Sequence, residues 1–170
     1  MAGAGTEARG GGGRGVTEIY VDADACPVKA EVLRVAERHG LRVHMVGNSW
    51  MRIGDDRTVN RVVVPATPDA ADDWIAEHIG PGDIAIAADI PLAARCIERG
   101  AQVLGPTGKP FTEAGIGVAL AMRDLSAHLR ETGEIRGFNP SFSAKDKSRF
   151  LDALERMVRS AIQLSRRSFS

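Results

Sequence analysis

Cysteine is scarce, long apolar runs are missing, and neither sign of charge is in excess in this 170-residue chain. Its two cysteines, Cys26 and Cys96, are too few for a disulfide scaffold or a cysteine-based zinc site. No apolar run approaches the ~20 residues that a membrane-spanning helix needs. Because 26% of the residues are also charged, a membrane protein is excluded. The length suits one globular domain.

The first fifteen residues lack the apolar stretch of a signal peptide and hold seven glycines. Glycine loses the most entropy on ordering and has no side chain to bury, so residues 1–15 are predicted to be a disordered tail. Without an export signal, we expect a cytoplasmic protein whose cysteines stay reduced. Residues 16–164 are predicted to form a single domain, and residues 165–170 a frayed C-terminus.

Strand and helix patterns alternate from Val16 onward. Short β-branched or apolar runs predict strands at 17–21, 41–46, 61–64, 83–88 and 101–104. Helical spacing predicts helices from Pro27 to Gly40 and from Asp69 through Ile79, and over 92–99, 114–130 and 143–163. This alternation predicts a three-layer α/β/α fold with a mainly parallel sheet.

Two predicted strands lead directly into an aspartate, Asp22 and Asp89. In open α/β sheets, sites form beyond the carboxyl ends of the strands, so both side chains are expected at one rim. A charge at the end of a buried strand is costly unless something pairs with it. These two residues are therefore the main candidates for a functional site.

Further aspartates are placed to join them. Asp24 lies on the same turn as Asp22, and either contributes to the site or caps the following helix. Asp69, Asp72 and Asp73 occupy the start of another predicted helix, where Asp69 is the expected N-cap. Adjacent residues do not share a helix face, so one of Asp72 and Asp73 must face solvent.

Carboxylates gathered in one cleft repel each other unless a cation lies among them. Oxygen ligands without paired histidine or cysteine favour Mg²⁺ or Mn²⁺, which serve phosphoryl chemistry. The pattern predicts that Asp22, Asp24, Asp72 and Asp89 bind one such ion. Cys26 is a weaker candidate for a nucleophile, because no histidine is spaced to activate it, and a small buried thiol is the alternative interpretation.

Three motifs resemble the YaiI/YqxD family of bacterial proteins. They are Val21–Pro27 (VDADACP), Ala88–Ala93 (ADIPLA) and Ala121–Asp124 (AMRD), and order and spacing match from about Ile19 to about Met157. The first two motifs together are specific. The family carries no established activity, so this resemblance implies a fold more than a function.

The family is in turn similar to the PIN/NYN nuclease superfamily, whose members use clustered carboxylates on a parallel sheet to bind Mg²⁺ or Mn²⁺ and cut RNA. This resemblance implies a PIN-like fold. By position, Asp22 resembles the aspartate that ends the first strand, Asp72 the helical acid, and Asp89 the aspartate that ends the later strand. Many PIN-type proteins have another acid two residues after the aspartate that ends the later strand. This chain has Pro91 at that place, so it lacks that ligand unless Asp24 replaces it.

A nuclease also needs groups that hold the scissile phosphate. Arg52, in the loop after the second strand, and Arg123, on the long helix, are the candidates for its positive charge. Arg123 could instead pair with an acid such as the adjacent Asp124. Asn48 either donates a hydrogen bond to the phosphate or closes a turn.

The alternative function is a non-catalytic RNA-binding or adaptor module. Residues 1–100 carry a net charge of −4 and residues 101–170 a net charge of +4. Basic side chains in the second part either contact RNA phosphates or solvate the last helix. These side chains are Lys145, Lys147, Arg149, Arg156, Arg159, Arg166 and Arg167.

Overall fold

The computed structural model describes residues 17–48, 59–67, 69–118, 121 and 143–169, without the side chains of Ala25 and of 165–169. The predicted tail over 1–15 lies outside the described residues. So does most of the helix predicted over 114–130, although residues 113–118 are helical.

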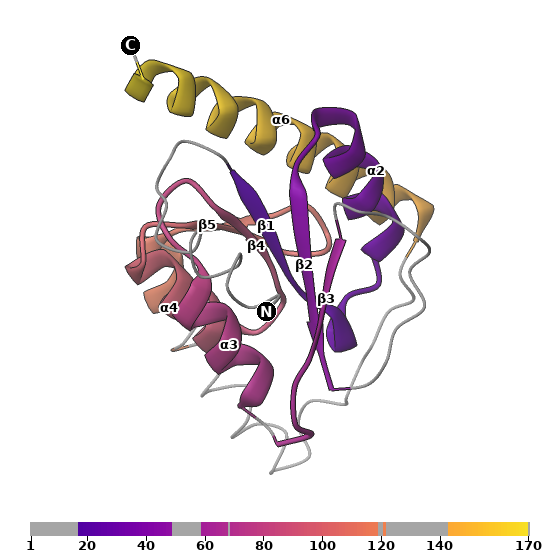
Figure 1. Ribbon diagram of the computed structural model, residues 1–170, viewed down its shortest axis with the longest axis vertical. Helices are drawn as coiled ribbons and strands as arrows, with labels where there is room; N and C mark the ends of the chain where they lie inside the picture. The colour runs from indigo at the N-terminus through magenta and orange to yellow at the C-terminus, as the bar shows by residue number, and fades with distance from the viewer. Residues whose placement is uncertain (1–16, 49–58, 68, 119–120, 122–142, 170) are drawn as a thin grey trace, which may run out of the picture.

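A six-stranded sheet forms the centre, in the order β3-β2-β1-β4-β5-β6 (Figure 1). Strands β1 to β5 pair in parallel and β6 pairs antiparallel with β5, which confirms the predicted mainly parallel sheet. The strands are β1 (Glu18–Asp22), β2 (Arg42–Gly47), β3 (Val59–Val63), β4 (Ile84–Ile86), β5 (Gln102–Leu104) and β6 (Pro110–Phe111).

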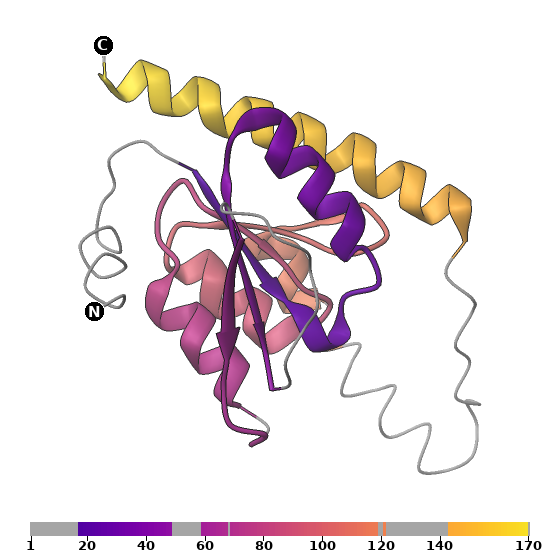
Figure 2. The same ribbon diagram turned by 45° about the vertical axis from the view of Figure 1, so that its right-hand side comes forward.

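Helices cover both faces of the sheet, which gives the three predicted layers (Figures 1 and 2). On one face, α2 (Lys29–His39) and α6 (Ala144–Phe169) pack on strand side chains such as Val21. On the other face, α3 (Ala70–His78) and α4 (Ile90–Glu98) enclose a second apolar core. Within the described residues, no helix is both long and apolar enough to cross a membrane.

The first helix starts later than predicted. The chain makes a 3₁₀ turn, η1 (Ala23–Ala25), after β1, and α2 begins at Lys29 rather than at Pro27. The Lys29 Nζ donates hydrogen bonds of 3.0 Å to the carbonyls of Ala23 and Cys26, which holds this turn. The predicted end is confirmed, because Gly40 has a φ of 68°, a conformation that side chains disfavour.

Other boundaries differ at the edges of the fold. Strand β3 begins at Val59, two residues before its predicted start. The short edge strand β6 was not predicted, because its first residue is Pro110 and proline argues against a strand except at the edge or end of a sheet. Helix α6 starts after Ser143, whose Oγ accepts from the Asp146 N–H while the Asp146 carboxylate accepts from the Ser143 N–H. It continues to Phe169, beyond the predicted end at residue 163.

The sheet also buries a polar group that the sequence analysis did not single out. His44 Nε2 lies 2.7 Å from the Glu18 carboxylate, and Asn60 Nδ2 lies 3.0 Å from His44 Nδ1. Tyr20 stacks on the His44 ring with centroids 4.4 Å apart. Strands β1, β2 and β3 are thus joined by paired polar side chains as well as by backbone bonds.

Candidate functional site

The strand order reverses between β1 and β4, since β2 and β3 lie on one side of β1 while β4, β5 and β6 lie on the other. Asp22 is the last residue of β1, and Asp89 follows β4 as the N-cap of α4. The two strands are parallel neighbours, with Val21 opposite Ile86. Both aspartates therefore lie at the carboxyl rim, at the switch point where α/β proteins commonly bind ligands.

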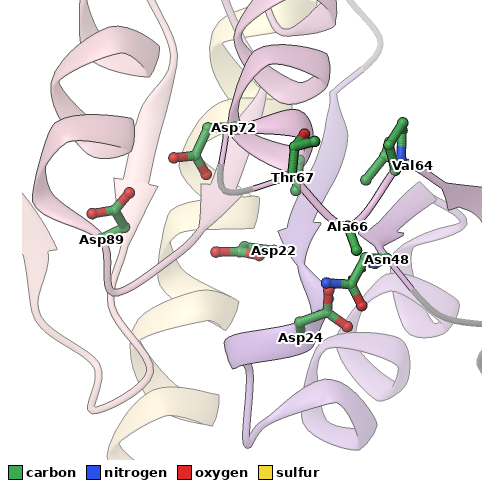
Figure 3. A pocket seen from close by; sticks show the side chains of 10 residues that line it. Asp22, Asp24, Asn48, Val64, Ala66, Thr67, Asp72 and Asp89 are labelled. Carbon is green, nitrogen blue, oxygen red and sulfur yellow. Dashed lines mark hydrogen bonds between the residues drawn. The ribbon is translucent and has the colours of Figure 1, made fainter.

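A pocket of about 360 Å³ opens at this switch point (Figure 3). Its volume falls in the range of small-molecule sites. All four predicted aspartates line it, and so does Asn48. The sequence analysis missed the remaining wall, although the segment after β3 also leaves a carboxyl strand end. That wall consists of Val64, Pro65, Ala66, Thr67 and Ala71.

Helix α3 contributes one aspartate to the pocket and turns its neighbour away. Asp72 lines the pocket, whereas Asp73 is paired with Arg95 at 2.9 Å and has an exposed side chain. Burial, a hydrogen bond with the Asp89 carboxyl and repulsion from Asp89 and Asp22 raise the pKa of Asp72 to about 7. At neutral pH this site therefore carries less negative charge than its sequence suggests.

Asp22 lies between the other acids and is half-buried. Burial raises the pKa of its carboxyl, and the negative charges of Asp24 and Asp89 raise it further. Asp69 occupies the N-cap position of α3, as predicted, but its side chain makes no capping hydrogen bond. Instead its charge adds to the repulsion on Asp72.

Asp24 does not cap the following helix. The N-cap of α2 is Val28, without a side-chain capping bond, whereas the Asp24 carboxylate accepts a 2.7 Å hydrogen bond from the Asn48 N–H. Figure 3 shows the two side chains next to each other on the side of the pocket away from Asp89. Arg52 and Arg123, the other predicted phosphate contacts, lie outside the described residues.

The two cysteines are buried. Burial raises the pKa of Cys26 to about 11 and that of Cys96 to about 12. A thiol that stays protonated at neutral pH is a poor nucleophile, which favours the small buried thiol over a reactive Cys26.

The acidic side chains of the pocket are oxygen donors, the kind that a hard divalent cation prefers. Within the described part of the chain, no three His, Cys, Asp or Glu side chains converge to hold an ion by themselves. Mg²⁺, however, usually keeps several waters and is bound through one or two carboxylates. The Asp22, Asp72 and Asp89 carboxyls, which line one pocket, fit such a water-rich shell.

The pH dependence of stability reports on this cluster. A carboxyl whose pKa is raised by folding binds more protons in the folded state than in the unfolded state. Without divalent cations, the contribution of Asp72 to the free energy of unfolding therefore falls as the pH rises from about 4 to about 7. Asp72→Asn removes that titration. The carboxyl is only partly buried, so the effect is reduced by solvent. We expect the free energy of unfolding of the variant, relative to that of wild type, to be about 1–2 kcal/mol higher at about pH 8 than at about pH 4.5.

Urea denaturation of both proteins at the two pH values measures this difference. A stability difference that stays constant with pH would contradict the raised pKa of Asp72.

Fold and site together define an α/β protein with an acidic pocket at the switch point of a mostly parallel sheet. The family model described as "Uncharacterized BCR, YaiI/YqxD family" matches residues 20–160. The chain belongs to this family.

Among its relatives, a "UPF0178 protein" of Parvibaculum lavamentivorans is 63% identical over 143 residues, which cover 84% of this chain and 94% of the relative. Another, from Rhodospirillum rubrum, is 61% identical over 142 residues, or 83% and 95% of the two chains. One from Rhizobium etli is 60% identical over 147 residues, or 86% and 95%. No solved structure matches the chain.

Proposed function

We propose that this protein is a Mg²⁺- or Mn²⁺-dependent nuclease that hydrolyses RNA phosphodiester bonds in the acidic pocket. The observation that carries the proposal is the pocket at the switch point, whose wall brings together Asp22, Asp24, Asp72 and Asp89. A cation there would relieve the repulsion that raises the pKa of Asp72. The resemblance to PIN/NYN domains, and with it a PIN-like fold, belongs to the same proposal.

Each acid has a role in this mechanism. Asp22 and Asp89 would be the main ligands of the cation, with Asp24 and Asp72 beside it. The cation, when bound, would activate water and neutralise charge on the phosphate. Asp72 or Asp24 would accept the proton of the attacking water as general base. None of the described residues that line the pocket is a histidine, so solvent would protonate the leaving oxygen.

Substrate contacts would come from the rim of the pocket. Asn48 lies at the rim with an exposed side chain, whose amide N–H would donate to a phosphate oxygen. The described lining residues include no Lys or Arg, so the positive charge is assigned, as a prediction, to Arg52 and Arg123.

The alternative RNA-binding module has less support. Three of its basic residues on α6 lie within 4.0 Å of acids on the same helix, since Arg149 faces Asp146, Arg156 faces Asp152 and Arg159 faces Glu155. These acids reduce the positive field along that surface. Phosphate binding there would therefore be weaker than the basic residues alone imply.

End-labelled single-stranded RNA, incubated with the protein in Mn²⁺, in Mg²⁺ or in EDTA, tests the proposal. We expect cleavage in either metal and none in EDTA, with a matching DNA strand showing whether the sugar matters. RNA that is bound equally well in EDTA and stays intact would support the module instead. RNA that is neither bound nor cut would contradict both functions.

A further inference from the structure

Gly47, the last residue of β2, lies directly against the Asp24 carboxylate. A Cβ built on Gly47 would lie 2.9 Å from Asp24 Oδ1 and 3.1 Å from both its Cγ and its Oδ2. The next residue, Asn48, donates its backbone N–H to Asp24 Oδ2 at 2.7 Å. The end of β2 thus both makes room for this carboxylate and binds it.

Backbone conformation does not explain the glycine. The described glycines with positive φ are Gly40, Gly82, Gly100 and Gly108, so Gly47 has a conformation open to any residue. It pairs with Val63 of β3 in regular parallel register and is buried. The close approach of Asp24 is therefore what a side chain at this position would disturb.

The three nearest atoms that a Cβ would meet all belong to the Asp24 carboxylate, not to backbone. This carboxylate is the far end of a flexible, exposed side chain, so it can turn away while the sheet stays in place. A methyl group on Gly47 would therefore move Asp24 more than it would unfold the strand. Asp24 would then lose its bond to Asn48 and its position in the pocket.

We infer that Gly47 is a positioning residue of the acidic pocket: its missing side chain holds the Asp24 carboxylate against the Asn48 N–H, where it contributes to cation binding. This inference rests on the proposed metal-dependent function. Asp24 and Asp22 line the same pocket, so moving the Asp24 carboxylate changes the electric field at the centre of that pocket. Residues that orient a metal shell typically affect affinity or activity about ten- to a hundredfold.

Four variants test the inference: Gly47→Ala, Asp24→Ala, the double variant, and Gly80→Ala as matched control. Gly80 has no atom within 4 Å of a built Cβ and no positive φ. Mn²⁺ affinity is measured by calorimetry, and the Asn48 amide proton is followed by NMR. We expect Gly47→Ala and Asp24→Ala each to weaken Mn²⁺ binding about ten- to a hundredfold, with the double variant no weaker than either.

The Asn48 amide proton is expected to shift upfield in Gly47→Ala as in Asp24→Ala, and to stay in place in Gly80→Ala. Wild-type affinity in Gly47→Ala, or losses that add in the double variant, would overturn the inference while leaving the proposed function intact. Wild-type protein that does not bind Mn²⁺ would overturn both.

If Gly47→Ala does not fold, the double variant decides, because it lacks the carboxylate that a Cβ would meet. It is expected to fold and to match Asp24→Ala in Mn²⁺ affinity. A double variant that also fails to fold would show that Gly47 is needed for another reason, and would overturn the inference.

Discussion

Asp89→Asn is expected to reduce Mn²⁺-dependent RNA cleavage by at least about a hundredfold. The change keeps the shape of the side chain but removes the charge that faces Asp72 across the pocket. It takes away a proposed cation ligand, and it also lets the pKa of Asp72 fall from about 7 toward its ordinary range. Initial rates on single-stranded RNA measure the loss, with circular dichroism confirming that the variant is folded.

Asp73→Asn is the matched control. Asp73 is the immediate neighbour of Asp72 on α3, but its carboxylate faces Arg95 outside the pocket. Because both partners are exposed, losing this pair costs little stability. We expect near wild-type cleavage from Asp73→Asn, purified in the same way. Equal rates for Asp89→Asn and wild type would remove the central residue of the mechanism.

Phe150→Ala is expected to lower the free energy of unfolding by about 3–5 kcal/mol. Phe150 is fully buried where α6 packs against α2 and the sheet, together with Leu154 and Val158. The turn before β6 packs on the same point, since a Cβ on Gly108 would lie 3.2 Å from the Phe150 backbone nitrogen. Because the ring is fully buried in this core, removing it leaves a cavity.

Urea denaturation measures this change, with Leu164→Ala as control on the same helix. Leu164 is 57% exposed, so truncation of its side chain is expected to change stability by no more than about 0.5 kcal/mol. If both variants lost the same stability, α6 would not be docked through its apolar side.

Much of the fold could be predicted because its signals are local. Apolar runs such as 83–88 contain the buried strand β4, and glycines such as Gly40 end helices where a left-handed residue is needed. The edge strand β6 carries no such signal, since two residues acquire strand character only by pairing with β5. The start of α2 was missed because bonds from Lys29 to two carbonyls hold a separate turn before it.

The sequence by itself determined which residues follow the strands, and therefore that aspartates lie at the carboxyl rim. Strand ends and side-chain charge are properties of short segments. Only the tertiary structure decided which of them interact. Asp72 faces Asp89 while Asp73 faces Arg95, and Asp24 binds Asn48 rather than capping a helix. These partners lie far apart in the chain, and their contacts depend on the strand order and on how α3 packs on the sheet.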